Sequence, residues 1–159
     1  MLEKFHVAQK DIVHVEEKRL RTVTKEILMT QGIPKKDAIL ATDALIKADL
    51  RGVESHGVSN MLRAYLGAFK SNSLNPKPNW KIVKETPSCA TINSDNGLGI
   101  VVAPQAMEIA VEKAKKTGAG VVTMNNCGHL GMLAYHSMIA SDNDMIGTTM
   151  AACSPRMVP

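Results

Sequence analysis

The chain has 159 residues, and its apolar fraction of 45% is enough for one domain with a real core, or for a domain with a small appendage. Its net charge of +4 arises without a dense basic run or interleaved aromatic side chains, so we expect no nucleic-acid partner. No apolar run reaches the length of a membrane span, so we expect no membrane association.

The first part of the chain is expected to be mainly helical. Apolar side chains recur there at the spacing of one helix face. Gly32 suits the end of one helix, and Pro34 suits the first turn of the next. A short strand is expected before the first helix, at 13–15. The helices are predicted over residues 16–32, 34–50 and 58–70.

A break in the helical pattern is predicted over 71–81. The segment Asn75-Pro76-Lys77-Pro78-Asn79 lies within it and fits neither a helix nor a central strand. We therefore place a boundary here, between a mainly helical subdomain at 1–75 and a second subdomain at 76–159.

Strands and helices alternate after this break, which is typical of an α/β layer. Gly118 and Gly120 are predicted to end one helix, and a short buried strand follows them. The last predicted strand would leave an unprotected sheet edge. The elements in order are hairpin strands at 80–84 and 89–92, a helix around 103–114, a strand at 120–124, a helix at 130–141 and a strand at 145–151.

Two histidines stand in glycine frames. His56 follows Ser55 and precedes Gly57, and His129 lies in the segment Gly128-His129-Leu130-Gly131. Glycines allow sharp backbone turns that can hold a side chain in a cleft, and histidine suits proton transfer near neutral pH. The alternative is a structural role, in which Ser55 caps a helix. For His129, a junction from strand through loop to helix favours a ligand site.

Other motifs favour ordinary structural roles. Adjacent Ser55 and His56 would usually point apart, and the chain has no GxSxG motif, so a hydrolase dyad is disfavoured. The run Asp95-Asn96-Gly97-Leu98-Gly99 matches neither phosphate-binding fingerprint and is interpreted as a glycine turn before a helix. His136 is interpreted as ordinary, and His6 and His14 as surface residues.

The cysteines indicate a reducing compartment. The chain has an odd number of cysteines, three, and they lie far apart in the sequence, at Cys89, Cys127 and Cys153. This argues for free thiols in a cytoplasmic protein. No CxxC or HxxxH spacing is present, so no metal site is predicted. The first ten residues lack the apolar run of a signal peptide.

The motifs in combination and order resemble the malate/L-lactate dehydrogenase family of NAD(P)-dependent 2-hydroxyacid oxidoreductases. This family is distinct from the Rossmann-fold lactate and malate dehydrogenases and includes ureidoglycolate and sulfolactate enzymes. The motifs that carry the resemblance are ADLRGVESHGVSNMLRAY at 48–65, the Asn/Pro-rich break, the glycine turn at 95–99, the second histidine frame at 128–131 and Ala152-Cys153-Ser154-Pro155.

The resemblance implies a fold, a substrate class and a cofactor. The implied fold is a non-Rossmann α/β arrangement like that of L-sulfolactate dehydrogenase, with a helical subdomain, assembled as a homodimer. The implied substrate is a small 2-oxo or 2-hydroxy acid, and the cofactor is NAD or NADP. One of His56 and His129 is implied to be the proton donor, and which one stays open. Ser154 is implied to contact the nicotinamide cofactor.

Two departures from the family pattern bear on the substrate. Many members carry an arginine four residues after the first histidine and a tyrosine four residues later, whereas here position 60 is Asn60 and the tyrosine comes one residue late, as Tyr65. A one-residue shift on a helix rotates a side chain by about 100°. Arg63 is the candidate replacement for the missing guanidinium. Arg51 is another candidate cation, and its alternative is a structural role at the end of a helix. We expect Ser55, Asn60, Arg63 and Tyr65 to bind substrate.

Family members are also much longer than this chain. We therefore expect it to be an N-terminal fragment, a truncated reading frame or one part of a split protein. One hypothesis is an oxidoreductase of this family, or its N-terminal portion. The alternative is a truncated, catalytically incompetent module that self-associates through the apolar surface its missing half should cover.

Overall fold

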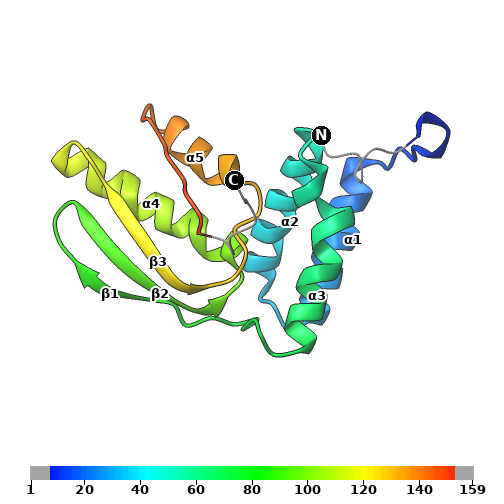
Figure 1. The fold of residues 1–159 in the computed structure, drawn as a ribbon, viewed down its shortest axis with the longest axis horizontal. Helices are drawn as coiled ribbons and strands as arrows, with labels where there is room; N and C mark the ends of the chain where they lie inside the picture. Colours follow the sequence, from blue (N-terminus) through cyan, green and yellow to red (C-terminus); the bar gives the residue numbers. More distant parts are fainter. Residues whose placement is uncertain (1–7, 153–159) are drawn as a thin grey trace, which may run out of the picture.

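The computed structural model describes residues 8–152. Figure 1 shows a group of helices beside a small sheet, with α4 and α5 lying over one face of that sheet. The α/β class expected from the sequence is confirmed. No described helix is both long enough and apolar enough to cross a lipid bilayer.

The helical part follows the predicted order. Gly32 has a φ of +85°, a conformation that favours glycine, and it separates the first two helices. A 3₁₀ turn and a π-helical turn lead into the third helix. The bounds are a 3₁₀ turn at Gln9–Asp11, α1 at Glu17–Thr30, α2 at Lys35–Leu50, a 3₁₀ turn at Glu54–His56, a π turn at Val58–Leu62 and α3 at Arg63–Lys70.

The sheet has three strands in the order β1-β2-β3. β1 (Lys81–Glu85) and β2 (Cys89–Gly97) form the predicted antiparallel hairpin. β2 then connects through α4 (Gly99–Thr117) to β3 (Val121–Cys127), which pairs with it in parallel. Parallel strands cannot be joined by a tight turn, so the pair needs a long crossover connection, which α4 provides here. α5 (Leu133–Ser141) follows β3.

One apolar cluster joins the helical part to the helices that cover the sheet. Small alanines on α2 allow neighbouring helices to approach closely, and Ala38, Ala41 and Ala48 are fully buried. The cluster unites α1, α2 and α3 with the first turns of α4 and α5, through Leu28, Leu45, Tyr65, Phe69, Ile100, Val101, Met132 and Tyr135 among others. The division into subdomains at residue 75 stays a prediction.

Three sequence expectations are wrong. The strand at 13–15 is absent, and Val13 is 81% exposed. The strand at 145–151 is also absent, because no described strand pairs with it; Ser137 Oγ instead donates to Thr149 Oγ1 at 2.9 Å, which holds this segment beside α5. β3 is not buried on both faces, since Val121 is 54% exposed. An apolar run forms a strand only where a backbone partner is available.

Candidate acid–base site

The first histidine lies in a loop that is held against the end of α2. Gly52, with φ of +70°, turns the chain away from the helix. The Asp49 carboxylate then accepts the backbone N–H of Val58 at 2.9 Å. A Cβ at Gly57 would collide with this carboxylate, so the close approach requires glycine. The Ser55-His56 pair is thereby fixed between α2 and the π turn.

The second histidine lies in the loop from β3 to α5. Gly128 N–H donates to the carbonyl of Gly97 at 2.9 Å, so the loop lies directly beside the start of α4. A Cβ at Gly99 would collide with the backbone of Gly128 and His129. Gly131 has a φ of +67°, which turns the chain toward α5. The glycine frame seen in the sequence therefore sets the position of the His129 backbone.

The fold brings the two histidine rings together from segments more than 70 positions apart. Their centroids lie 5.3 Å apart and the rings are stacked, with 15° between their planes. Ser55 Oγ lies 2.9 Å from His56 Nδ1, so the expectation that these neighbours point apart is wrong. The 3₁₀ turn at Glu54–His56 tightens the backbone and brings the two side chains to the same side.

Tyr65 reaches the second histidine despite its late position in the sequence. Its hydroxyl oxygen lies 2.9 Å from His129 Nδ1. The π turn at Val58–Leu62 explains this contact, because a π turn contains one more residue than an α-helical turn. The extra residue is absorbed before α3 begins, so the rotation expected from the one-residue shift does not separate Tyr65 from the histidines.

Burial controls the charge of the site. Desolvation lowers the pKa of His129, and the neighbouring His56 lowers it further. Burial also raises the pKa of Tyr65, which keeps the phenol protonated. Among residues 8–152, no group of three or more acidic, histidine or cysteine side chains could hold a metal ion. The described site is therefore a pair of imidazoles with neutral hydroxyl partners.

The remaining candidate residues lie around this pair or outside the described range. Asn60 is exposed, and its amide donates to the Glu54 carbonyl at 2.8 Å, which ties the π turn to the 3₁₀ turn. Arg63 is exposed and forms no ion pair with any described residue. Ser154, together with Cys153, lies outside the described residues.

Sequence reasoning missed two groups that shape the site. Asp49 holds the first loop, and its only signal is its place six residues before Ser55, in the last turn of α2. The backbone amide of Gly131 donates to His129 Nδ1 at 3.2 Å, a contact that no side-chain pattern reveals. His136, interpreted as ordinary, is 1% exposed, and its Nε2–H donates to the Leu130 carbonyl at 2.8 Å.

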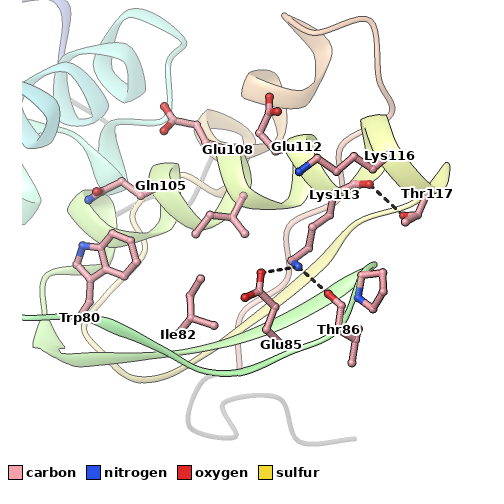
Figure 2. Close-up of a pocket in the computed structure, with 12 residues that line it drawn as sticks. Trp80, Ile82, Glu85, Thr86, Gln105, Glu108, Glu112, Lys113, Lys116 and Thr117 are labelled. Atoms are coloured by element: carbon pink, nitrogen blue, oxygen red, sulfur yellow. Dashed lines mark hydrogen bonds and ion pairs between the residues drawn. The ribbon is translucent and has the colours of Figure 1, made fainter.

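A separate cavity of about 770 Å³ lies between β1 and α4 and does not include the histidines. Figure 2 shows Trp80 at one end of it and the buried Lys113 side chain at the other. Lys113 Nζ donates to Glu85 Oε1 at 2.8 Å and to the Thr86 carbonyl at 2.7 Å. These bonds tie the turn of the β1–β2 hairpin to α4, which indicates a structural role for Lys113.

The N-terminus of α4 does not provide a cradle for dinucleotide phosphates. Helix N-termini bind phosphate where their backbone N–H groups face open space. Here Leu98 is 2% exposed and Ile100 is 1% exposed, and Gly99 is packed against the His129 loop. This agrees with the interpretation of residues 95–99 as a glycine turn before a helix. The start of α4 therefore leaves no open group of backbone N–H donors for a phosphate.

The chain belongs to the malate/L-lactate dehydrogenase family, whose profile matches residues 15–159. It is 44% identical to the L-sulfolactate dehydrogenase of Methanocaldococcus jannaschii over 134 residues, which are 84% of this chain and 39% of that protein. It is 39% identical to the malate dehydrogenase of Pyrococcus abyssi over all 159 residues, which correspond to 43% of that protein.

A solved structure shows the same fold. The malate dehydrogenase of Pyrococcus horikoshii superimposes with a TM-score of 0.82 at 38% identity, over 90% of this chain and 40% of that one. The resemblance and the fold inferred from the sequence motifs are therefore confirmed. The chain spans less than half the length of these relatives.

Proposed function

We propose that this chain forms the acid–base portion of an NAD(P)-dependent dehydrogenase that interconverts a small 2-hydroxy acid and the corresponding 2-oxo acid. The observation that carries the proposal is the stacked pair of His56 and His129, which the fold assembles from two distant glycine-framed loops. The names of the relatives support the substrate class, since they are sulfolactate, malate and ureidoglycolate dehydrogenases.

The proposed chemistry divides between the cofactor and the protein. A bound nicotinamide would supply the hydride that carbon 2 gains on reduction, or accept it on oxidation. The oxygen on that carbon gains or loses a proton in the same reaction, and the protein must provide it. We propose that His56 and His129 do so, because the two rings lie close enough for one imidazole to exchange the proton while the other hydrogen-bonds the same oxygen.

The substrate carboxylate needs a positive partner. We propose Arg63, because it is exposed, directly follows the π turn as the first residue of α3, and has no described carboxylate bound to it. Guanidinium–carboxylate contacts are stronger than those of a neutral amide. Asn60 and Ser55 are proposed to shape the same site. Ser154 is proposed, from the resemblance, to contact the nicotinamide.

The wider setting is also proposed. Cys89 and Cys127 are free thiols, which suits the reducing cytoplasm. The relatives leave the choice between NAD and NADP open, although one of them is named as NAD-dependent. A homodimer is proposed because large apolar side chains are exposed on the segment after α5, as with Ile146 at 99%.

A chimera tests the proposed function. In it, this chain replaces the matching N-terminal portion of the Pyrococcus abyssi malate dehydrogenase. We expect the chimera to oxidise malate, sulfolactate or another 2-hydroxy acid with NAD⁺ or NADP⁺, followed by absorbance of the reduced cofactor. A cooperative melting transition would establish that the chimera folds. A folded chimera without activity on any acid of the panel, beside an active parent, would contradict the proposal.

A further inference from the structure

The two site histidines have different kinds of hydrogen-bond partner. His129 Nδ1 faces the backbone N–H of Gly131 at 3.2 Å and the hydroxyl of Tyr65 at 2.9 Å. A backbone N–H can only donate, so Nδ1 must offer its lone pair and cannot carry a proton. The neutral ring of His129 therefore carries its proton on Nε2.

Tyr65 reinforces this tautomer. The side chain is 2% exposed, and its burial keeps the phenol neutral. A neutral phenol that faces an acceptor nitrogen donates its O–H to it. Two donors thus converge on one lone pair, and a proton placed on Nδ1 would face both of them. The charged imidazolium of His129 is disfavoured by this geometry, independently of the burial of the ring.

His56 has no such restriction. Its Nδ1 lies 2.9 Å from Ser55 Oγ, and a serine hydroxyl either donates or accepts. When Nδ1 is bare, the hydroxyl donates to it, and when Nδ1 is protonated, the hydroxyl accepts from it. His56 therefore keeps this hydrogen bond in both charge states. Among the described residues, the titratable groups that face His129 are His56 and Tyr65.

We infer that His56 exchanges the proton with the substrate oxygen, and that His129 stays neutral and hydrogen-bonds that oxygen through Nε2–H. Tyr65 is the positioning residue that fixes the His129 tautomer. The inference rests on the proposed function for the identity of the substrate oxygen. The division of labour between the two rings rests on hydrogen-bond geometry together with the neutral phenol of Tyr65. On reduction, His56 gives its proton to the oxygen of the former carbonyl as carbon 2 gains the hydride.

Nitrogen NMR on this chain tests the inference without any enzymatic assay. The histidines are labelled with ¹⁵N, assigned with single His→Gln variants, and followed from pH 8 to pH 5, the range in which histidine titrates. We expect His129 to show a bare Nδ1 and a protonated Nε2, and to gain a second proton only below its ordinary pKa of 6.5. A protonated Nδ1 on His129 at neutral pH would overturn the inference.

Two matched tyrosine variants isolate the positioning role. Tyr65→Phe removes one donor to Nδ1, so we expect the pKa of His129 to rise and its Nδ1–H tautomer to become detectable. Tyr135→Phe removes another buried hydroxyl, one that donates to Asp43 and not to His129, and should leave the His129 signals unchanged. Identical His129 spectra in Tyr65→Phe and in the parent chain would refute the role of Tyr65. These readouts do not depend on turnover, so an inactive chimera would contradict the proposed function and not the tautomer assignment.

Discussion

At the scale of single residues, the site depends on which groups can only donate a hydrogen bond and which can either donate or accept one. The Gly131 amide fixes the tautomer of His129, whereas the Ser55 hydroxyl can hydrogen-bond His56 in either of its charge states. The glycine frames made both histidines predictable from the sequence. The partners of His129 were not predictable, because a backbone amide leaves no sequence signal and because the reach of Tyr65 depends on a π turn.

Gly57 provides a test of how the first loop is held. In Gly57→Ala, the new Cβ would displace the Asp49 carboxylate, and Val58 N–H would lose its acceptor. We expect the free energy of unfolding to fall by about 1.5–3 kcal/mol, the value of a hydrogen bond to a charged group. Urea denaturation followed by circular dichroism measures this change.

Gly67 is the matched control, because it lies within α3 and a Cβ there would meet nothing within 4 Å. Gly67→Ala should raise the free energy of unfolding by about 0.5–1 kcal/mol through helix propensity. Equal effects of the two substitutions would show that the Asp49 contact does not hold the loop.

At the scale of elements, the helices and the hairpin were predictable because their apolar spacing and their end signals agree. α2 follows its alanine pattern, and Gly118, with φ of +82°, ends α4 as expected. The π turn was not predictable, since its residues fit an ordinary helical pattern. The strand at 145–151 failed for another reason: local sequence specifies an extended chain, but a ladder also needs a partner strand.

The burial of His136 on α5 predicts that the stability of the fold depends on pH. Burial lowers the pKa of His136 on this helix below its ordinary value of 6.5, and His136 Nδ1 has no described partner. The unfolded chain therefore binds a proton at higher pH than the folded chain does. The resulting stability is present above pH 6.5 and is lost as the pH falls.

Unfolding free energies measured at pH 7.5 and at pH 5.5 test this, and we expect the lower value at the lower pH, within the histidine range. The His136→Gln variant should show a smaller difference between the two conditions. Exposed His14 serves as the control, and His14→Gln should keep the full difference. A pH dependence that is unchanged in His136→Gln would exclude this residue as its source.

A carboxylate on α2 joins three helices. Asp43 accepts bonds from Arg21 on α1 at 2.9 Å and from Tyr135 on α5 at 2.8 Å, and it pairs with Lys47 at 3.1 Å. Burial acts to raise the pKa of Asp43, but the bonds from Tyr135, Lys47 and Arg21 outweigh it, so the pKa is lowered.

Loss of this carboxylate should therefore weaken the junction of the three helices. We expect Asp43→Ala to lower the free energy of unfolding by about 1–3 kcal/mol, because it leaves half-buried donors unpaired. Hydrogen exchange should show the loss of protection at α1 and α5. Glu112→Ala removes only an exposed pair with Lys115 and should leave the melting temperature unchanged. Similar melting temperatures for the two variants would contradict a joining role for Asp43.

At the scale of the whole molecule, one apolar cluster unites the helices with the sheet-covering layer, and the two histidine loops meet at its edge. The sequence predicted each loop but not their meeting, because that depends on how α2, α3 and α4 pack together. The family resemblance led us to expect both histidines in one site, and in the structure the ring centroids of His56 and His129 lie 5.3 Å apart.

Exposed apolar side chains predict self-association of the chain. Ile146 is 99% exposed, Met150 is 84% exposed, and Val83 and Val121 on the sheet are both more than half exposed. Such surface favours contact with another copy. We expect sedimentation velocity to show a dimer or a larger species, and the double variant Ile146→Lys, Met150→Lys to shift the distribution toward monomer. A parent chain that stays monomeric at every concentration would exclude this surface as an interface.

The turnover number of the chimera, measured in four histidine variants, tests the central claim most directly. Loss of acid–base catalysis typically costs about 10²–10⁴-fold in rate. We expect His56→Ala and His56→Gln to lose kcat by the same factor, because neither alanine nor glutamine can exchange a proton. His129→Gln retains an N–H donor and should recover part of the kcat that His129→Ala loses. The opposite pattern, with partial recovery in His56→Gln and none in His129→Gln, would contradict the account.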